Sequence, residues 1–470
     1  MRYDLCVIGS GPAGQRAAVQ AAKLGRQVCI IERREVIGGV AINTGTIPSK
    51  ALREAILHSS AFKHRLAQAS GPIGKRDVTI EELTYWCQHV IKGEIDVVRS
   101  QLSRNGVEVR VGTGTFVNPN TVLVRHGNEE TRLEADHFLI ATGTRPARPK
   151  DIPFDHAHIV DADGLFGLHS LPRTLTVVGG GVIGTEYASM LQALGVKVTL
   201  IEGRNELMEF LDSEIRESLQ YHLRQAGMTL RLGEKVVKVA LIDAPEGARS
   251  VSGKLVEATL ESGKVLRSDT LLYCVGRQGC TDELGLEAIG LQADNRGRIT
   301  VNEHYQTEVP HIYAAGDVIG FPALASTSME QGRLSACHMF GVPTQSTPEL
   351  FPFGIYAVPE ISMVGWTEEQ LTREDIPYET GIAHYREIAR GQLLGDAIGM
   401  LKILVHQDSR HILGVHCIGT GATEIIHIGQ AVMSLKGTVD YFVETVFNYP
   451  TLAECYKVAA LNVVNKLIHV

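Results

Sequence analysis

The amino-acid sequence predicts an α/β fold that contains two copies of one strand–turn–helix–strand unit. The first copy begins with an apolar segment at 3–8, continues through a glycine turn at 9–14 and a helical pattern, and ends with a second apolar segment at 28–32. The second copy, at 175–202, repeats this order. Glycine makes up 48 of the 470 residues, above the usual ~7%, and glycines form both turns.

Each part of this unit suits the binding of a dinucleotide. In the first copy Gly9 permits the tight turn, Gly11 lets the backbone approach a pyrophosphate, and Gly14 lets the helix pack against the strand. The helix N-terminus offers unpaired N–H groups to phosphates, and Glu32 can accept a hydrogen bond from a ribose hydroxyl. The equivalent residues of the second copy are Gly179, Gly181, Gly184 and Glu202. Two Rossmann-like units in one chain indicate one bound flavin and one exchanging nicotinamide nucleotide.

Charge and composition argue against other classes of partner. Lys and Arg total 45 and Asp and Glu total 53, so the formal net charge is −8. This argues against nucleic acid or an anionic membrane as the main partner. The sequence shows neither a membrane-spanning apolar run nor a signal-peptide pattern, so we expect a cytoplasmic protein. The eight cysteines and 18 histidines are scattered without metal-ligand spacing, which predicts reduced thiols and no metal site.

Three further segments fit two nucleotide sites. The apolar run at 138–143 ends in a glycine turn, and 271–277 repeats that design. The segment 312–317 predicts a strand that enters a turn with Asp317 at its tip, placed to bind a ribityl hydroxyl. A stripe with helical spacing predicts a core face, and it comprises Leu83, Trp86, Cys87, Val90, Ile91, Ile95, Val98 and Leu102.

With these motifs in this order, essentially the whole chain resembles the flavoproteins of the glutathione reductase and dihydrolipoamide dehydrogenase type. The resemblance implies that the first copy binds FAD and the second binds NAD(P)H. It also implies that the C-terminal third, starting near Thr347, is an α+β domain that forms a homodimer or a larger homo-oligomer. The implied domains are FAD-binding at 1–148 and 278–345, NAD(P)-binding at 149–277, and dimerisation at 346–470.

The resemblance and the motifs together define the expected cofactor sites. The residues expected to bind FAD are Gly9, Gly11, Pro12, Ala13, Gly14, Glu32, Arg33, Gly39, Thr46, Lys50, Gly114, Thr142, Gly143 and Asp317. The residues expected to bind NAD(H) or NADP(H) are Gly179, Gly181, Val182, Ile183, Gly184, Glu186, Glu202, Arg204 and Gly276. Glu202 would favour the ribose hydroxyl of NAD(H), and Arg204 could bind the 2′-phosphate of NADP(H). The alternative is that Arg204 is a solvated loop residue that binds no nucleotide.

Two departures from the disulfide reductases are informative. Those enzymes carry a pair of cysteines after the second strand, and the corresponding residues here are Ala41 and Thr46. Because thiol–disulfide exchange needs a nucleophilic sulfur beside the flavin, disulfide reduction is excluded. Near the C-terminus Tyr449 replaces the reductases' acid/base histidine, and Glu454 remains. With a phenol pKa of about 10, Tyr449 is a poor proton shuttle at neutral pH.

The remaining flavin machinery is expected to be complete. In the family, the lysine at the position of Lys50 lies beside flavin N5 and pairs with the acid at the position of Glu186. The segments GTIPSKALR at 45–53 and FNYPTLAE at 447–454 resemble the soluble pyridine nucleotide transhydrogenases. This resemblance implies reversible hydride transfer between NADPH and NAD+ through FAD. The alternatives are an NAD(P)H dehydrogenase or diaphorase that reduces a quinone or dye, and a non-enzymatic flavin-binding relative.

Overall fold

The computed structural model describes residues 2–70, 79–168, 170–344 and 350–467, without the side chains of 60–70. It divides into two compact units. The first comprises Met1–Ser59, Pro72–Arg148 and Val275–Pro348, and the second comprises Ser60–Gly71, Pro149–Cys274 and Glu349–Val470. The predicted start of the C-terminal domain near Thr347 lies outside the described residues.

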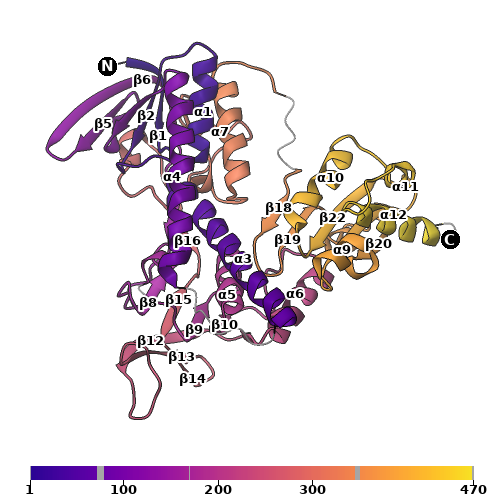
Figure 1. Ribbon diagram of the computed structural model, residues 1–470. Helices are drawn as coiled ribbons and strands as arrows, with labels where there is room; N and C mark the ends of the chain where they lie inside the picture. The colour runs from indigo at the N-terminus through magenta and orange to yellow at the C-terminus, as the bar shows by residue number, and fades with distance from the viewer. Residues whose placement is uncertain (1, 71–78, 169, 345–349, 468–470) are drawn as a thin grey trace. The chain divides into compact units, whose positions relative to one another are not determined.

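The first unit is built on a mixed sheet of seven strands (Figure 1). The strands are β1 (Arg2–Ile8), β2 (Val28–Glu32), β3 (Glu108–Val111), β4 (Thr113–Asn118), β5 (Thr121–His126), β6 (Glu129–Ile140) and β17 (Ile312–Ala314). Strands β3, β2, β1, β6 and β17 pair in parallel, while β4, β5 and β6 form an antiparallel meander. The helices of this unit are α1 (Pro12–Lys23), α2 (Gly39–Asn43), α4 (Ile80–Arg104) and α7 (Ala325–Met339), together with the start of α3 (Thr46–Ser70).

Strand β1 has an apolar layer on each face, because successive side chains of a strand point in opposite directions. Leu5 and Val7 belong to the cluster that contains the alanines of α1, whereas Cys6 and Ile8 belong to the cluster on the other face. Helices α1 and α7 lie side by side (Figure 1). A methyl group at Gly332 of α7 would collide with the Ala13 carbonyl of α1.

On helix α4, most residues of the predicted core face are buried. Leu83, Cys87, Ile95, Val98 and Leu102 are buried. Trp86 is an exception: it is 49% exposed, so the stripe is narrower than the sequence suggested.

The nucleotide-binding part of the second unit repeats the topology of the first. Its parallel sheet has the order β11-β10-β9-β15-β8, in which β10-β9-β15 matches β2-β1-β6. The strands are β8 (Ile159–Asp161), β9 (Thr174–Val178), β10 (Lys197–Glu202), β11 (Thr229–Leu232) and β15 (Thr270–Tyr273). An antiparallel sheet is formed by β12 (Val236–Asp243), β13 (Lys254–Leu260) and β14 (Val265–Ser268), and the helices are α5 (Val182–Ala193) and α6 (Ser213–Gln225). The predicted α/β repeat is confirmed.

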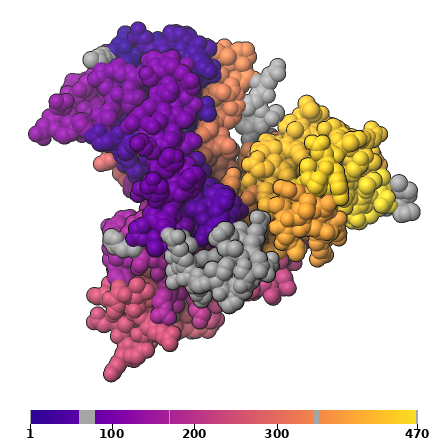
Figure 2. All heavy atoms as spheres, viewed as in Figure 1, coloured from indigo at the N-terminus to yellow at the C-terminus, as the bar shows by residue number. Residues whose placement is uncertain are grey.

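The rest of the second unit is a five-stranded antiparallel sheet with helices, shown in orange and yellow in Figures 1 and 2. Its order is β18-β19-β22-β21-β20. The strands are β18 (Phe353–Ile355), β19 (Ile361–Gly365), β20 (Tyr378–His384), β21 (Met400–His406) and β22 (Ile412–Ile418). The helices are α8 (Glu368–Arg373), α9 (Ala389–Leu394), α10 (Ala422–Ser434), α11 (Asp440–Glu444) and α12 (Glu454–Leu467). Among all described helices, none combines the length and apolar character of a membrane span.

Candidate functional site

The first glycine turn brings backbone atoms together so closely that side chains would not fit. Gly9 has a φ of +109°, and a methyl group there would collide with the Ala141 carbonyl. A methyl group at Gly14 would collide with the Gly9 carbonyl. At Gly11, by contrast, a methyl group would meet no protein atom within 4 Å. The turn is therefore crowded on its protein side and open beside Gly11.

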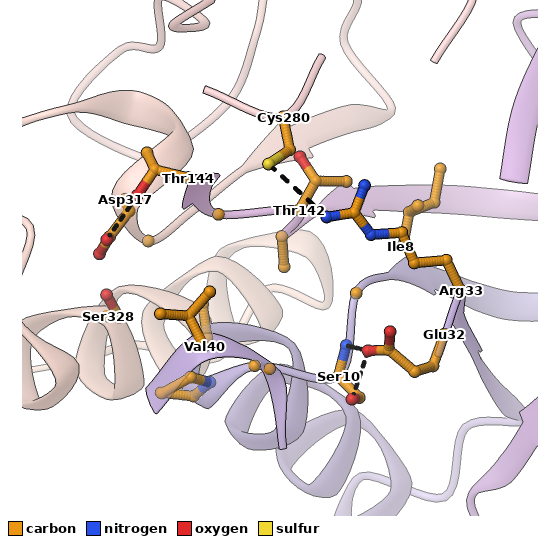
Figure 3. A pocket seen from close by; sticks show the side chains of 18 of the residues that line it. Ile8, Ser10, Glu32, Arg33, Val40, Thr142, Thr144, Cys280, Asp317 and Ser328 are labelled. Atoms are coloured by element: carbon orange, nitrogen blue, oxygen red, sulfur yellow. Dashed lines mark hydrogen bonds between the residues drawn. The ribbon is translucent and has the colours of Figure 1, made fainter. Parts of the chain in front are cut away.

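A cavity of the first unit opens at this turn (Figure 3). The N-terminus of α1 borders it, and the N-cap residue Gly11 supplies no side-chain hydrogen bond to the first turn. The residues expected to bind FAD that line the cavity are Gly9, Gly11, Pro12, Ala13, Glu32, Arg33, Gly39, Thr46, Gly114, Thr142, Gly143 and Asp317. Gly14 and Lys50 are not among its lining residues. Gly14 lies on α1, where it packs against the turn.

The carboxylate of Glu32 is part of the turn itself. Its Oε2 accepts hydrogen bonds from the Ser10 N–H at 3.1 Å and the Ser10 hydroxyl at 2.6 Å. Its Oε1 accepts one from the Arg34 N–H at 3.0 Å. Glu32 lies at the carboxyl end of β2 and borders the cavity (Figure 3). It thus holds the turn and also presents a carboxylate at the edge where a ribose would bind.

A hydrogen-bonded chain holds Asp317 at another edge of the cavity. The Thr144 hydroxyl donates to Asp317 Oδ2 at 3.1 Å (Figure 3). Arg277 Nε donates to Thr144 Oγ1 at 2.8 Å, and Arg277 Nη2 donates to the Thr144 carbonyl at 2.9 Å. Thr144 and Arg277 lie on the two-stranded sheet of β7 (Thr144–Pro146) and β16 (Arg277–Gly279). This chain fixes the orientation of the Asp317 carboxylate.

The cavity residues fit FAD on two independent observations. The Thr142 hydroxyl is buried at the cavity, and no group of the described residues hydrogen-bonds to it. Buried hydroxyls normally have partners, so this atom is suited to a ligand. The open space at Gly11, beside a helix N-terminus, suits a pyrophosphate. The cavity thus offers a polar group to FAD at Thr142 and space for its charged pyrophosphate at Gly11.

The segment that carries a redox disulfide in the reductases carries none here. Ala41 on α2 and Thr46 at the start of α3 both line the cavity. All eight cysteines lie in described parts of the chain, and none forms a disulfide. Cys280 also borders the cavity, with its Sγ 4.0 Å from Arg33 Nη2 (Figure 3). Arg33 extends from the carboxyl end of β2, far in sequence from Cys280.

Several lining residues were missed by sequence reasoning. They are Ser10, Arg34, Arg145, Cys280, Asp282 and Ser328. Ser10 lies inside the glycine turn and could have been found there. Arg34 follows the predicted Glu32 and Arg33, and Arg145 follows the predicted glycine turn at 138–143, so both could also have been found. The others come from segments without a nucleotide motif, and only the fold brings them to the cavity.

The second glycine turn has the same backbone geometry as the first. Gly179 has a φ of +104°, and a methyl group at Gly184 would collide with the Gly179 carbonyl. A methyl group at Gly181, the N-cap residue of α5, would meet no atom within 4 Å. Val182 and Ile183 form the first positions of α5. Gly276, with a φ of +83°, belongs to the first unit, directly after the chain returns to it at Val275.

Glu202 and Arg204 lie together at the carboxyl end of β10. Glu202 Oε2 accepts the Gly180 N–H at 2.7 Å, and Arg204 Nε lies 3.1 Å from Glu202 Oε1. Burial alone would raise the pKa of Glu202, but the hydrogen bonds from Arg204 and Gly180 outweigh it and hold the pKa below its ordinary value. The Arg204 side chain is 46% exposed, so its guanidinium is accessible to a ligand.

The expected catalytic residues lie in different units. Lys50 is on α3 in the first unit, and its Nζ lies 3.3 Å from the Ser49 hydroxyl. Glu186 is on α5 in the second unit, is 4% exposed, and accepts the Tyr356 N–H at 2.8 Å. The pairing of Lys50 with Glu186 stays a prediction.

The two C-terminal candidates differ in exposure. Tyr449 is 74% exposed and lies in the connection between α11 and α12. Glu454 is the first residue of α12, and its Oε2 is buried with no hydrogen-bond partner among the described residues. Their approach to a flavin stays a prediction.

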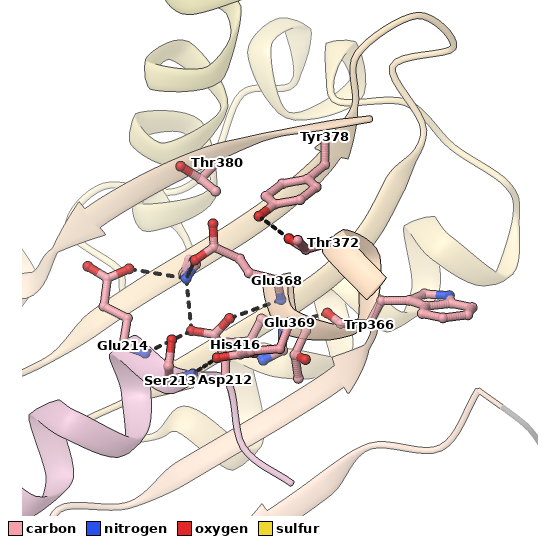
Figure 4. A network of polar contacts seen from close by, with 12 residues as sticks. Asp212, Ser213, Glu214, Trp366, Glu368, Glu369, Thr372, Tyr378, Thr380 and His416 are labelled. Atoms are coloured by element: carbon pink, nitrogen blue, oxygen red, sulfur yellow. Dashed lines mark hydrogen bonds and ion pairs between the residues drawn. The ribbon is translucent and has the colours of Figure 1, made fainter. Parts of the chain in front are cut away.

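One group of acids resembles a metal site in its spacing. Among the described residues, carboxylate oxygens of Asp212, Glu214 and Glu368 lie within 4.8 Å of one another (Figure 4). The Lys402 ammonium forms an ion pair with each of them. Lys402 thus supplies the positive charge that the cluster needs.

Comparison with known proteins agrees with this arrangement. The family model of the pyridine nucleotide-disulphide oxidoreductases matches residues 3–332, and the model of their dimerisation domain matches 351–460. The chain is 52% identical over 467 residues to a soluble pyridine nucleotide transhydrogenase of Mycobacterium tuberculosis, covering 99% of this chain and 98% of the relative. It is 44% identical to the protein of that name from Photobacterium profundum, with the same shares covered.

Solved structures show the same fold. LpdA from Mycobacterium tuberculosis has a TM-score of 0.87 at 25% identity, covering 98% of this chain and 99% of that chain. The HOCl-induced flavoprotein disulfide reductase RclA from Escherichia coli, as its Cu(II) complex, has the same score, identity and coverage. The resemblance predicted from the motifs is confirmed: this chain belongs to the pyridine nucleotide-disulphide oxidoreductase family.

Proposed function

We propose that this protein uses FAD to transfer a hydride reversibly between NADPH and NAD+. The observation that carries this proposal is the cavity lined by the residues expected to bind FAD, whose border has Ala41 and Thr46 where disulfide reductases have cysteines. The residues expected to bind the flavin are present, whereas the two cysteines that would accept electrons from the flavin are replaced. The curated relatives at 52% and 44% identity, named soluble pyridine nucleotide transhydrogenases, support the same activity.

One FAD per subunit would be held by the first unit. The backbone at Gly11 and the N-terminus of α1 would receive the pyrophosphate, Glu32 a ribose hydroxyl, and Asp317 a ribityl hydroxyl. The unpartnered Thr142 hydroxyl is a further contact. When bound, FAD supplies a two-electron carrier that stays on the protein while the two nucleotides exchange, and no side chain provides one. The protein's part is to bind and align the reactants, and alignment is the main requirement of hydride transfer.

The second unit would bind NAD(H) and NADP(H) in turn at one site. Gly181, Gly184 and the N-terminus of α5 would receive the pyrophosphate. Glu202 would bind the ribose hydroxyl of NAD(H), and Arg204 the 2′-phosphate of NADP(H). The net reaction, NADPH + NAD+ ⇌ NADP+ + NADH, neither consumes nor releases a proton. No acid/base group is therefore needed, which agrees with a tyrosine at 449.

Lys50 and Glu186 would form an ion pair beside the flavin that orients the ring. A feature within the second unit supports this role for Glu186. Its Oε1 is held by the Tyr356 N–H at 2.8 Å. Ser189, one helical turn further along α5, accepts the Val358 N–H at 3.0 Å and donates to the Glu186 carbonyl at 2.9 Å. The carboxylate and its helix are thus fixed in place.

We expect a homodimer, or a larger homo-oligomer, in the cytoplasm. The match to the dimerisation domain supports self-association. The C-terminal region also exposes several large apolar side chains. They are Leu435 at 84%, Val446 at 89%, Tyr449 at 74% and Leu461 at 42%. Tyr449 and Glu454 would approach the flavin of the other subunit. The proposed domain limits are 1–148 and 278–345, 149–277, and 346–470.

A two-step anaerobic experiment tests the function. The purified yellow protein is first mixed with one equivalent of NADPH and then with NAD+, while the flavin absorbance is followed. The proposal expects the absorbance to bleach in the first step, and to return in the second step as NADH forms. Recovery with a quinone but not with NAD+ would favour a quinone reductase. A protein that binds FAD but is bleached by neither NADPH nor NADH would be a non-enzymatic relative.

A further inference from the structure

The loop at 203–212 joins the carboxyl end of β10 to α6 and carries Arg204. At its start, the Arg204 N–H donates to the Glu202 carboxylate at 3.0 Å, and the Arg204 carbonyl accepts the Gly233 N–H at 2.8 Å. Leu207 packs against the second glycine turn, because a methyl group at Gly180 would collide with its Cδ2. The shape of this loop therefore affects both the Arg204 guanidinium and the turn at α5.

One guanidinium, that of Arg216 on α6, holds the loop at three points. Its Nη1 donates to the Leu211 carbonyl at 3.1 Å and to the Glu209 carbonyl at 3.4 Å. Its Nη2 forms an ion pair with Glu206 at 2.7 Å. Arg216 is only 8% exposed. A planar fork of fixed N–H donors can make these contacts at once, which a lysine ammonium on a flexible stem cannot do in the same way.

The loop backbone is strained where Arg216 holds it. Met208 has a φ of +45°, in the left-handed region that an unbranched side chain rarely adopts. Leu207, Met208 and Leu211 are nevertheless buried, with exposures of 0%, 1% and 1%. Residues in such conformations persist only when surrounding contacts determine them. Losing the Arg216 contacts would therefore let the loop relax.

The far end of the loop is fixed independently. Asp212 is the N-cap residue of α6, where its Oδ1 accepts the Glu214 N–H at 3.3 Å (Figure 4). The same atom accepts a hydrogen bond from Lys402 Nζ at 2.8 Å, and both side chains are completely buried. Arg216 therefore holds the segment 206–211, which lies between Arg204 and this cap.

We propose that Arg216 is a positioning residue for nucleotide selection: by holding the 203–212 loop it places Arg204 where the guanidinium can reach a 2′-phosphate. Arg216 makes this contribution through the loop and touches no nucleotide. This inference rests on the proposed function, because it assumes that Arg204 distinguishes NADPH from NADH. It adds a residue that no nucleotide-binding motif contains.

The test compares Arg216→Lys with Arg224→Lys, an exposed arginine in the last turn of the same helix. The concentrations of NADPH and NADH that give half the maximal rate of flavin reduction are measured in single turnovers and serve as the KM values, so the test does not depend on NAD+ as acceptor. Arg216→Lys should raise the KM for NADPH about threefold to tenfold more than that for NADH, a size typical of coupled neighbours. The maximal rate and the flavin content should stay the same, and Arg224→Lys should change nothing.

A double-mutant cycle separates positioning from general loosening of the structure. In an Arg204→Ala background, Arg216→Lys should no longer change the NADPH/NADH ratio of KM values, because the group it positions is absent. An equal effect on both nucleotides, or the same ratio change with and without Arg204, would overturn the inference.

If Arg216→Lys strongly lowers the melting temperature, a second variant is used. Glu206→Gln removes only one of the three contacts, and the Glu206 side chain is 48% exposed. Glu206→Gln should raise the NADPH/NADH ratio of KM values in the same direction but by a smaller factor. An unchanged ratio would count against the inference. Failure of NAD+ to accept electrons would contradict the proposed function and leave these ratios measurable.

Discussion

Arg204 and Glu202 form a two-bond ion pair, with Nε 3.1 Å from Oε1 and Nη2 3.2 Å from Oε2. Glu202 also accepts the Gly180 N–H of the glycine turn. A carboxylate suited to a ribose hydroxyl and a guanidinium suited to a phosphate thus occupy one edge of the nucleotide-binding sheet. In the proposed function the guanidinium would exchange one anionic partner, the Glu202 carboxylate, for another, the 2′-phosphate, and this exchange would moderate the preference for either nucleotide.

Replacing Arg204 should therefore change nucleotide preference. Arg204→Ala removes a charge-assisted contact worth about 1.5–3 kcal/mol, or roughly 10- to 150-fold. We expect the KM for NADPH to rise by a factor in this range while the KM for NADH changes little. Steady-state kinetics with each nucleotide measure this, with Arg224→Ala as the control. Equal increases for both nucleotides would mean that Arg204 does not touch the 2′-phosphate.

The two glycines of the first turn should respond differently to substitution. A methyl group at Gly11 meets no protein atom within 4 Å, whereas one at Gly14 collides with the Gly9 carbonyl. We expect Gly11→Val to give a folded protein that is colourless, because the side chain occupies the pyrophosphate position. Gly14→Val should lose soluble folded protein altogether. The checks are circular dichroism and the flavin content after incubation with FAD. A yellow Gly11→Val protein would contradict the assigned pyrophosphate position.

The buried Lys402 network should be important for stability. Lys402 and Asp212 are both 0% exposed, so Lys402→Met leaves an uncompensated buried carboxylate. Breaking such a pair costs about 3–5 kcal/mol. Arg125→Met, which breaks an exposed pair with Glu130, should cost at most about 1 kcal/mol. Urea unfolding monitored by circular dichroism gives both values, and similar losses for the two variants would be inconsistent with this role.

The same network gives the sign of a pH effect. Burial alone would raise the pKa of Asp212, but the neighbouring His416, together with the charge and hydrogen bond of Lys402, outweighs it and lowers the pKa below its ordinary value. A carboxyl group with a lowered folded-state pKa stabilises the protein above its unfolded pKa of about 3.9, and this stabilisation is lost as the pH falls through the folded-state pKa. Asp212→Asn should therefore weaken the acid dependence of unfolding.

Tyr449 should contribute little to the rate. Net hydride exchange moves no proton, so Tyr449→Phe is expected to keep most of the activity. The pH dependence of the rate between about pH 6 and 8 should be the same with and without the hydroxyl. The measurement is the rate as a function of pH for both proteins. A loss of about a hundredfold or more, typical of a missing acid/base group, would identify Tyr449 as a proton donor and favour quinone reduction.

The glycine turns could be predicted from the sequence because backbone geometry leaves no other choice of residue. Gly9 and Gly179 both adopt positive φ, and Gly14 and Gly184 both approach a carbonyl too closely for a side chain. Such constraints are local in the chain. They therefore leave a pattern that a single sequence displays, and the 170-residue repeat of that pattern from Gly9 to Gly179 gave the topology.

Contacts between distant segments could not be predicted in this way. Cys280 reaches the cavity beside Arg33, and Lys402 bonds to Asp212 across 190 positions of the chain. Only a lysine inside the apolar strand 400–406 hinted at a buried partner, without identifying it. Helical spacing likewise predicted the direction of the α4 core face but not its width, so Trp86 was wrongly assigned to it.

The central claim is that electrons pass between two nicotinamide nucleotides without a thiol acceptor. The most direct test is steady-state reduction of a thio-analogue of NAD+ by NADPH, followed at the separate absorbance of the reduced analogue, with no quinone or disulfide present. The account predicts one reduced analogue for each NADPH consumed, at a rate proportional to bound FAD. NADPH consumption that requires an added quinone or disulfide, or no reduction of the analogue by the FAD-loaded protein, would contradict it.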